Sequence, residues 1–466
     1  MSRLTFPSAF LWGAATSAYQ IEGAAQLGGR GESVWDRYAG TKGMISDGTN
    51  GSVACDHYHR WQDDVLLLKQ FGLTAYRFST GWSRVMPNGR GAPNQEGLDF
   101  YDALVDMLLA AGIRPFVTLN HWDLPQALQD QGGWPSRETC SAFVEYAEHV
   151  ARRLGDRVKD WTTHNEPWCI AHLGWETGEH APGKRDPSAA LRAAHHLLLS
   201  HGQAIPVLRR DSPGARVGIV LNPVPGYAAS PSDADAEATR AFDGFINRWY
   251  LDPLYRGSYP ADAIAYRVRR GHLRGPELPF VESGDLAVIG TQTDYLGVNY
   301  YSRAVLRSDA IPEEENAPRT VLAAPAGERT EMGWEIFPRG LHDLTVRIHR
   351  DYAPERLYLT EMGAAFPDAR AGSGAVHDAR RVSFLGEHLR EAHRAIAAGA
   401  PIDGCFVWSL LDNFEWQFGY TKRFGLVWTD FANLQRTPKD SAHWYREVAT
   451  SNVVDDKGPL RAGEST

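Results

Sequence analysis

The sequence predicts a (β/α)8 barrel, an α/β fold, with long strand-to-helix loop insertions. Three observations lead to this prediction. Eight short runs rich in β-branched and aromatic residues are spread along the chain, amphipathic stretches of helical length follow most of them, and polar side chains gather where the runs end. Strands that alternate with helices build a parallel sheet. Eight such units are the number that closes a parallel barrel.

The expected strands and helices are found from residue type and from the spacing of apolar side chains. The strands span residues 10–14, 75–78, 114–120, 160–164, 217–222, 295–300, 357–360 and 404–408. Apolar residues recur at helical spacing in residues 61–71, 98–111, 137–154 and 379–397, which predicts helices there.

Four long stretches without periodicity follow strands, at residues 22–58, 167–187, 302–338 and 413–438. In a barrel of this kind such strand-to-helix loops build the active-site face. We expect one catalytic domain over residues 1–450 and a loose polar tail over 451–466. An open doubly wound sheet is the alternative, but it requires a Gly-rich first turn that opens onto a helix. The Gly-rich stretch at residues 28–31 comes too late and opens no helix.

The composition indicates a globular enzyme in a reducing compartment. Apolar residues make up 43% of the chain and aromatic residues 11%, and the 48 Lys and Arg against 57 Asp and Glu give a net charge of −9. No basic stripe suggests nucleic acid, and neither a signal peptide nor a membrane-spanning apolar run is found, so we expect a cytoplasmic protein. Four widely spaced cysteines indicate free thiols; they are Cys55, Cys140, Cys169 and Cys405.

A metal site is not expected. His195, His196 and His201 lie on one expected helix, but no His-Glu-x-x-His or paired Cys-x-x-Cys pattern accompanies them. Core or solvated histidines are the better interpretation.

Polar or aromatic residues with catalytic potential stand at or just past the ends of the expected strands, where barrel enzymes keep their catalytic groups. They are Gln20, Arg77, His121, Asn165, Glu166, Asn299, Tyr301, Glu361 and Trp408. Glu166 follows the fourth strand and Glu361 the seventh, so a closed barrel brings these two carboxyl groups face to face. Cleavage of a glycosidic bond requires such a pair. A single Glu at a strand end is more commonly a surface or ion-paired residue.

Several motifs carry a resemblance to a known family. They are FLWGAATSAYQIE at residues 10–22, NHWD at 120–123, THNEP at 163–167, GVNYY at 297–301, MGWE at 332–335, YLTEMG at 358–363 and WSLLDNFEW at 408–416. The chain is similar to glycoside hydrolase family 1, the β-glucosidase family, from Phe6 to about Tyr445. The resemblance implies a retaining β-glucosidase without cofactor or metal, in which Glu166 is the acid/base and Glu361 the nucleophile.

The resemblance also implies a substrate site for terminal β-D-glucosyl residues of cellobiose, short β-glucans and aryl or alkyl β-glucosides, with β-galactosidase or β-fucosidase side activity and transglycosylation as further possibilities. Arg77 and Tyr301 would flank the nucleophile, and Trp334 is either an aglycone platform or a loop-packing residue. The residues expected to bind the sugar are Gln20, His121, Trp122, Asn165, Asn299, Trp408, Glu415, Trp416 and Phe424.

Physical chemistry predicts different pKa values for the two glutamates. Arg77 and Tyr301 would keep the pKa of Glu361 low, whereas burial and the charge of Glu361 would raise the pKa of Glu166. Two neighbours depart from the family pattern, because His164 and Met362 stand where Leu or Phe and Asn are usual. Strand alternation predicts that His164 points to the same side as Glu166. A protonated His164 would then lower the pKa of the acid/base.

Three alternatives within the same resemblance remain. A 6-phospho-β-glycosidase would carry Ser at position 415 and Lys and Tyr at positions 422 and 424, whereas this chain has Glu415, Lys422 and Phe424. A carboxylate at position 415 would repel a phosphate, which favours an unphosphorylated sugar. A thioglucosidase would have Gln at position 166, and a catalytically silent carbohydrate-binding paralogue would lack one of the two glutamates.

Overall fold

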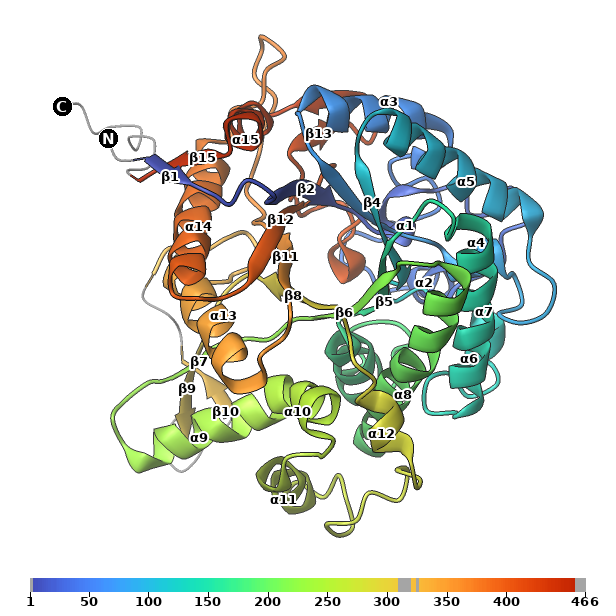
Figure 1. Cartoon of the computed structure of the whole chain (residues 1–466), viewed down its shortest axis with the longest axis vertical. Coiled ribbons are helices and arrows are strands. Elements are labelled where there is room, and N and C mark those ends of the chain that lie inside the picture. The colour runs from blue at the N-terminus through green and yellow to red at the C-terminus, as the bar shows by residue number, and fades with distance from the viewer. Residues whose placement is uncertain (1–2, 309–319, 324–326, 457–466) are drawn as a thin grey trace.

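The computed structural model describes residues 3–308, 320–323 and 327–456. Eight parallel strands form a closed barrel in the order β11-β12-β2-β3-β4-β5-β6-β8, which confirms the predicted fold (Figure 1). Each expected strand is present with ends shifted by at most two residues. The barrel strands are β2 Leu11–Ala15, β3 Ala75–Ser79, β4 Arg114–Asn120, β5 Asp160–Asn165, β6 Arg216–Leu221, β8 Tyr295–Tyr300, β11 Leu357–Met362 and β12 Ile402–Trp408.

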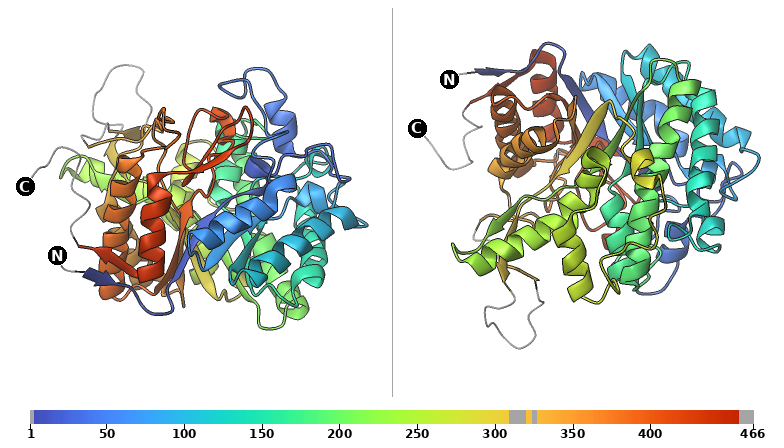
Figure 2. Two further views of the ribbon diagram at one scale, coloured as in Figure 1. Left: turned by 90° about the horizontal axis from the view of Figure 1, so that it is seen from above. Right: turned by 60° about the horizontal axis from the view of Figure 1, so that its bottom comes forward.

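Long helices surround the barrel (Figure 2). They are α3 His57–Gln70, α5 Gln95–Ala110, α7 Glu138–Leu154, α8 Pro187–Asp211, α13 Pro338–Tyr352, α14 Ala379–Ala397 and α15 Asp440–Ser451. The four helices expected from sequence are α3, α5, α7 and α14. In α7 the buried residues Phe143, Tyr146, Ala147, Val150 and Leu154 recur every three or four positions and form one apolar face. This face packs α7 onto the barrel and its neighbour α8.

Short elements fill the strand-to-helix insertions. The first, fourth and last barrel strands are followed by α1 Ala18–Ile21 and α2 Val34–Ala39, by the π-helix η1 Cys169–Thr177, and by η3 Trp416–Phe418 with the hairpin β13 Val427–Thr429 and β14 Arg436–Pro438. The short helices α4 Trp82–Val85 and α6 Gln126–Gln129 follow β3 and β4. Part of the expected insertion at 302–338 lies outside the described residues.

A further long insertion, between β6 and β8, was not expected from the sequence. It contains β7 Gly226–Ala228, α9 Asp233–Asp243, η2 Gly244–Arg248, α10 Trp249–Arg256, α11 Ala261–Arg269 and α12 Asp285–Ile289. Strand β7 joins β9 Ala304–Ser308 and β10 Thr320–Leu322 in a small sheet beside the barrel. The helices of this insertion are amphipathic, so their spacing of apolar residues does not differ from that of the helices that surround the barrel.

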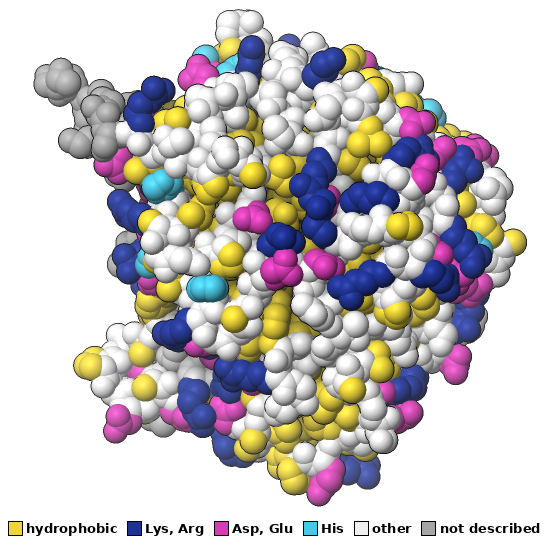
Figure 3. All heavy atoms as spheres, in the orientation of Figure 1, with side chains coloured by type: hydrophobic (Ala, Val, Ile, Leu, Met, Phe, Trp, Pro, Cys, Tyr) yellow, Lys and Arg dark blue, Asp and Glu magenta, His cyan; other side chains and the backbone are white. Residues whose placement is uncertain are grey.

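The core has two layers. Inside the barrel, Phe116, Tyr295, Tyr358 and Phe406 form an aromatic cluster, and a larger apolar layer lies between the strands and the helices. At the strand starts, the Asp160 carboxylate accepts hydrogen bonds from two arginine side chains, Arg114 and Arg216. Figure 3 shows one face of the molecule, on which basic and acidic side chains are interspersed.

The two ends of the chain meet in a small sheet. Strand β1 Arg3–Thr5 pairs with β15 Val453–Asp455 in antiparallel register. Residues 453–455 therefore form a strand and do not belong to a loose tail, while residues 457–466 of the expected tail lie outside the described residues. None of the helices in the described part of the chain is long and apolar enough to cross a membrane.

A buried charge network supports the loop after β12. The Lys439 ammonium donates to Asp368 at 2.6 Å and to Asp412 at 2.7 Å, and all three side chains are shielded from solvent. Asp412 in turn accepts from the backbone N–H of Gly425 at 2.9 Å and from Arg423 at 2.7 Å. Asp412 therefore ties the start of this loop to its end.

Replacing the buried ammonium is expected to destabilise the fold. Lys439→Met should lower the free energy of unfolding by about 3 kcal/mol, because it leaves two buried carboxylates short of a cation. Denaturant or thermal unfolding measures the change. In the matched control Arg37→Met, which breaks the exposed Arg37–Glu32 pair, we expect a loss below about 1 kcal/mol. Equal losses in the two variants would contradict the assigned role of Lys439.

Candidate active site

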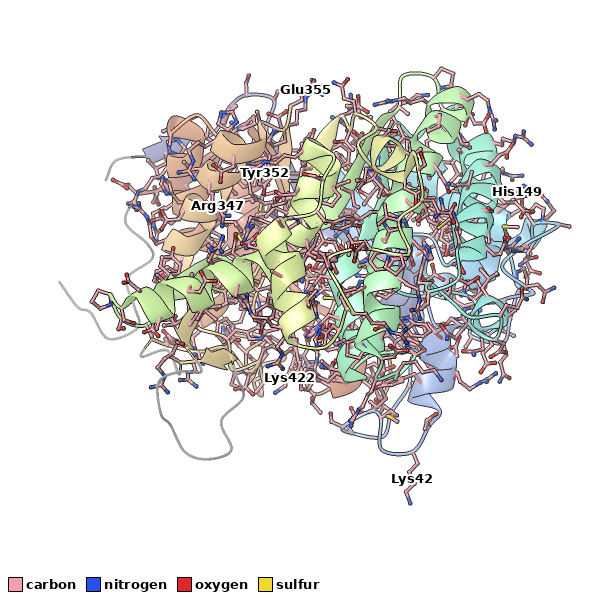
Figure 4. All side chains as sticks on the ribbon, turned by 90° about the horizontal axis from the view of Figure 1, so that it is seen from below. Lys42, His149, Arg347, Tyr352, Glu355 and Lys422 are labelled. Carbon is pink, nitrogen blue, oxygen red and sulfur yellow. The ribbon has the colours of Figure 1, made fainter. Side chains whose placement is uncertain are left out.

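The two predicted glutamates lie at the carboxyl ends of their strands and line one cavity of about 750 Å³. Glu361 is the next-to-last residue of β11, and Glu166 directly follows β5 with a φ of 48°. Lys42 and Lys422, on insertions after β2 and β12, lie at one end of the molecule, and Glu355, just before β11, lies at the other (Figure 4). The cavity opens at the end with the insertions.

Glu361 is held by two donors. Arg77 Nη1 donates to its Oε1 at 2.7 Å, and the Tyr301 hydroxyl donates to its Oε2 at 2.6 Å. Burial raises the pKa of Glu361 above its usual value, while Arg77 and Tyr301 act in the opposite direction. Both neighbours act in the expected direction, but the pKa of Glu361 is raised and not low as expected. Desolvation of the buried carboxylate outweighs one ion pair and one hydrogen bond.

Glu166 has a different environment. Asn299 Nδ2 donates to its Oε1 at 2.6 Å, and the Cys169 thiol donates to its Oε2 at 3.0 Å. Burial, followed by the negative charge of Glu361, raises the pKa of Glu166 to about 7. Only Glu361 has an arginine partner, so of the two carboxyl groups Glu166 takes up a proton first. Two carboxyl groups in different protonation states are what acid-assisted displacement requires.

An amide network fixes the strand ends around the glutamates. Asn165 Oδ1 accepts from Arg77 Nη2 at 2.7 Å and from Asn299 Nδ2 at 3.1 Å. Asn165 Nδ2 lies 3.1 Å from His121 Nε2. Burial and the charge of Arg77 lower the pKa of His121 well below its usual value, so its neutral ring can accept this hydrogen bond. The network joins four strands and leaves little freedom to either carboxyl group.

The deep part of the cavity contains a third carboxyl group, that of Glu415, and the indole rings of Trp408 and Trp416. Gln20 Nε2 donates to the Phe414 carbonyl at 2.8 Å and lies 3.5 Å from Glu415 Oε2. Burial, followed by the charges of Glu361 and Glu166, raises the pKa of Glu415 to about 8. Near pH 7 most of this group is therefore protonated. The predicted repulsion of a phosphate by a negative Glu415 is therefore weaker than expected.

The predicted site residues fall into two groups. Gln20, Arg77 and Asn165 lie behind the cavity and hold other side chains in place. The others line the cavity wall, as expected; they are His121, Trp122, Glu166, Asn299, Tyr301, Trp334, Glu361, Trp408, Glu415, Trp416 and Phe424.

The outer part of the cavity is largely apolar. Trp334 packs against Tyr301 with ring centroids 5.2 Å apart, and its side chain also lines the cavity. The unexpected insertion after β6 also contributes to this wall. The apolar side chains of the outer part include Trp168, Leu173, Val224, Phe242, Ile246 and Val305.

Contrary to expectation, His164 does not point to the same side as Glu166. The register between β5 and β6 is irregular between Thr162 and Asn165, so alternation fails at this point. Thr162 bonds to Tyr295 inside the barrel, whereas Thr163 faces outward and lies 2.7 Å from His201 on α8. His164 follows Thr163 to the outside.

On the outer side of the barrel His164 is enclosed by neutral groups. Its Nε2 lies 2.9 Å from Ser200 Oγ, its Nδ1 lies 3.0 Å from Asn120 Nδ2, and its ring stacks on Phe143. Burial lowers the pKa of His164 well below its usual value. A neutral, outward-facing ring does not lower the pKa of Glu166, and that hypothesis is wrong. Met362 is likewise buried in the outer core layer and does not line the cavity.

The three histidines of α8 are core residues. His195 lies 2.9 Å from Asp285 Oδ2, His196 Nδ1 lies 2.9 Å from the Trp134 carbonyl, and His201 contacts Thr163. Within residues 3–308, 320–323 and 327–456, no group of three or more His, Cys, Asp or Glu is placed to hold a metal ion.

Two residues of the cavity wall are not among the predicted site residues. Cys169 is expected from the sequence only to be a free thiol, yet it donates to Glu166 Oε2. Asn222 donates to Cys169 Sγ at 3.5 Å and lines the cavity. Cys169 follows Glu166 by three residues at the start of a helical segment, a spacing that could have indicated its contact with Glu166. Asn222 directly follows β6, a position that could have indicated that it lines the cavity.

Comparison with known proteins identifies the family of this fold and site. The model of glycosyl hydrolase family 1 matches residues 2–454. The chain belongs to this family. It is 45% identical to β-glucosidase A of Acetivibrio thermocellus, over 97% of this chain and 100% of that one. It is 44% identical to a bifunctional β-D-glucosidase/β-D-fucosidase of Bifidobacterium breve, over 95% and 98% of the two chains.

Solved structures of the family share the barrel. The family 1 β-glucosidase of Thermotoga maritima superposes with a TM-score of 0.93 at 42% identity, over 98% of this chain and 100% of that one. A structure of the β-glucosidase from the same organism contains glucoimidazole and superposes with a TM-score of 0.91 at 42% identity, over 96% and 99% of the chains. This chain is therefore a glycoside hydrolase with a (β/α)8 barrel.

Proposed function

We propose that this glycoside hydrolase is a retaining β-glucosidase that removes terminal non-reducing β-D-glucosyl residues. The observation that carries the proposal is the pairing, in one cavity, of an arginine-bound carboxylate, Glu361, with a carboxyl group whose pKa burial raises to about 7, Glu166. The relatives bear the name β-glucosidase. The relative also named as a β-D-fucosidase supports the inclusion of fucosidase side activity.

In the proposed first step, a Glu361 oxygen attacks the anomeric carbon while Glu166 gives its proton to the leaving oxygen. Arg77 and the Tyr301 hydroxyl orient Glu361 and balance its charge until the bond forms. Once Glu361 is an ester its charge is gone, so the pKa of Glu166 falls. The ionised Glu166 then takes a proton from water, which attacks the same carbon from the opposite face to that of Glu361 and releases the sugar.

The test of retention is the configuration of the first product. If Glu361 forms a covalent intermediate, ¹H NMR of a reacting aryl β-glucoside should show β-glucose first and the α-anomer only by later mutarotation. Early appearance of α-glucose would mean direct attack by water. It would contradict the nucleophile assignment.

For the glucosyl unit we propose the deep part of the cavity, with Trp408 beneath the ring and Glu415 close to the hydroxyl groups. Gln20 supports Glu415 from behind the cavity. The apolar outer part supports aryl, alkyl or β-linked glucosyl aglycones, with Trp334 as a platform. A panel of aryl β-glucosides, β-galactosides and β-fucosides with cellobiose tests this. We expect the highest kcat/KM for aryl β-glucosides. A preference for galactosides above all glucosides would overturn the assignment.

A phosphorylated sugar is the rival substrate. Lys422, the one residue shared with the phospho-specific pattern, donates to the Glu331 carbonyl at 2.8 Å and is not part of the described cavity wall. No cation from that position would then meet a phosphate on the sugar. Equal turnover of plain and 6-phosphorylated aryl glucosides would overturn the preference for the plain sugar.

We expect the alkaline limb of the pH dependence of kcat/KM to lie near pH 7. Glu166 must be protonated to act as the acid, and burial and the charge of Glu361 raise its pKa to about 7. Activity is therefore lost as the pH rises through this value. The profile of a para-nitrophenyl β-glucoside measures it. His164→Leu is the control: its limb should coincide with that of the wild type. A limb that shifts in this variant would restore a role for His164.

We also infer a cytoplasmic location. All four cysteines are free and buried, and proteins with unpaired thiols are typical of reducing compartments.

A further inference from the structure

We propose that Cys169 is a positioning residue for the acid/base. Its thiol donates a hydrogen bond to one oxygen of Glu166 and thereby sets which oxygen carries the catalytic proton and the pH above which that proton is lost. This inference rests on the proposed role of Glu166 as the acid/base.

Chain geometry brings the thiol to the carboxyl group. Glu166 leaves β5 with a φ of 48°, and its carbonyl accepts from the backbone N–H of Cys169 at 2.9 Å. This bond starts the helical segment that continues as η1. Residues three apart on a helical turn lie on one side, so Cys169 Sγ lies 3.0 Å from Glu166 Oε2. The backbone and side-chain hydrogen bonds together fix the carboxyl group at the cavity wall.

The direction of the hydrogen bond is fixed by the protonation state of the thiol. Burial and the neighbouring Glu166 raise the pKa of Cys169 well above its usual value, so the sulfur keeps its proton. Asn222 Nδ2 donates to the same sulfur at 3.5 Å. A sulfur that accepts from an amide is left with its own S–H as donor, and Glu166 Oε2 is the acceptor within reach. A short chain of hydrogen bonds therefore runs from the Asn222 amide through the Cys169 thiol to Glu166 Oε2.

The two oxygens of Glu166 thus differ in the strength of their donors. Oε1 accepts a 2.6 Å hydrogen bond from the Asn299 amide. To keep this bond, Oε1 must remain an acceptor whether or not the carboxyl group is protonated. Among the described residues, the donor to Oε2 is a thiol, which is a weak donor. The acid proton is therefore better placed on Oε2. Once the proton has left, the S–H bond stabilises the carboxylate and helps it to act as the base in the second step.

Other groups near Glu166 also influence its proton. They are Glu361 on β11, Arg77 on β3, Tyr301 just after β8 and Glu415 in the loop after β12. These groups set the overall pKa, and none of them donates a hydrogen bond to Oε2 in the described structure. A change at Cys169 alters this one hydrogen bond while the surrounding charges stay the same.

Two variants without a donor, Cys169→Ala and Cys169→Val, test the proposal through the alkaline limb of kcat/KM for an aryl β-glucoside. Loss of the donor removes stabilisation of the carboxylate, so the limb should move up by about 0.5 pH unit in both. Val leaves no cavity, so a shift shared with Ala reports the hydrogen bond and not a change in packing. Cys169→Ser, which restores a donor, should return the limb to the wild-type position or below it.

The matched control is Cys140→Ser. The Cys140 thiol donates to the His196 carbonyl between α7 and α8 at 3.3 Å, away from the cavity, so this limb should not move. If the limb stays in place in Ala and Val, or if Ser behaves as they do, the proposal fails. The profile of Glu166→Gln separates the two levels of inference. A limb that persists there refutes Glu166 as the acid, whereas a limb lost there but unmoved in the Cys169 variants refutes only the role of Cys169.

Discussion

Glu361→Gln is expected to lower kcat for aryl β-glucosides by at least about 10⁴-fold, because an amide oxygen is a poor nucleophile for the anomeric carbon. Arg77 Nη1 and the Tyr301 hydroxyl hold the two oxygens of Glu361 at 2.7 and 2.6 Å. The variant keeps the shape of the side chain: its amide oxygen can still accept from Arg77, and its amide NH2 can donate to the Tyr301 oxygen. The fold and the cavity should persist. Purified protein and a sensitive product assay measure the residual rate, and the thermal midpoint verifies folding.

A smaller variant makes this test specific for the nucleophile. Glu361→Gly opens space beside the anomeric carbon, and azide should then restore turnover and yield the α-glucosyl azide, the product of one inversion. A β-glucosyl azide would place the nucleophile elsewhere. Glu391→Gln is the matched control: Glu391 is a buried carboxylate on α14, outside the cavity. Its activity should remain within about twofold of the wild type. A comparable loss in the control would point to general disruption.

The sequence was sufficient to predict the barrel and to place both glutamates on one cavity at the carboxyl ends of its strands. This follows from topology: the ends of parallel strands in a closed barrel meet at one face, whatever their separation in the sequence. Glu166 and Glu361 could therefore be placed opposite each other without knowledge of any side-chain conformation. Alternation along a single strand was less reliable. The irregular register in β5 turns both Thr163 and His164 outward, and no residue type in this stretch predicts it.

Electrostatics was the second limit. The family resemblance implied that Arg77 and Tyr301 flank Glu361 and stabilise its carboxylate, and both donate to it and lower its pKa. The sign of its pKa shift depends instead on how completely water is excluded, which is a property of the whole cavity. Arg77 pairs with Glu361. Burial, followed by the charges of neighbouring carboxyl groups, raises the pKa values of Glu166 and Glu415 to about 7 and about 8.

The insertion after β6 shows a third limit. Helices α9 to α11 have the amphipathic pattern of barrel helices, yet they form part of a side structure that brings Phe242 and Ile246 to the outer cavity. Amphipathicity reports that a helix has an apolar face, not which surface that face meets. Cavity residues on this insertion therefore could not be predicted from periodicity.

Glu166→Ala should show a loss that depends on the leaving group. For an alkyl glucoside, whose leaving oxygen needs a proton, we expect kcat/KM to fall by about 10³-fold, within the usual range for a general acid. A dinitrophenyl glucoside needs little acid assistance, so its first step should be nearly unchanged. Its second step still requires Glu166 as a base, so the glycosyl-enzyme accumulates and both kcat and KM fall.

Azide separates this role from that of the nucleophile. In Glu166→Ala an azide ion can enter beside the anomeric carbon on the side where water attacks, and it should accelerate turnover and yield the β-glucosyl azide, the product of two inversions. A loss independent of the leaving group would contradict acid catalysis by Glu166. The Asn299 amide and the Cys169 thiol donate to the two carboxyl oxygens of Glu166. Truncation to Ala removes these acceptors, so the incoming azide can accept hydrogen bonds from both donors.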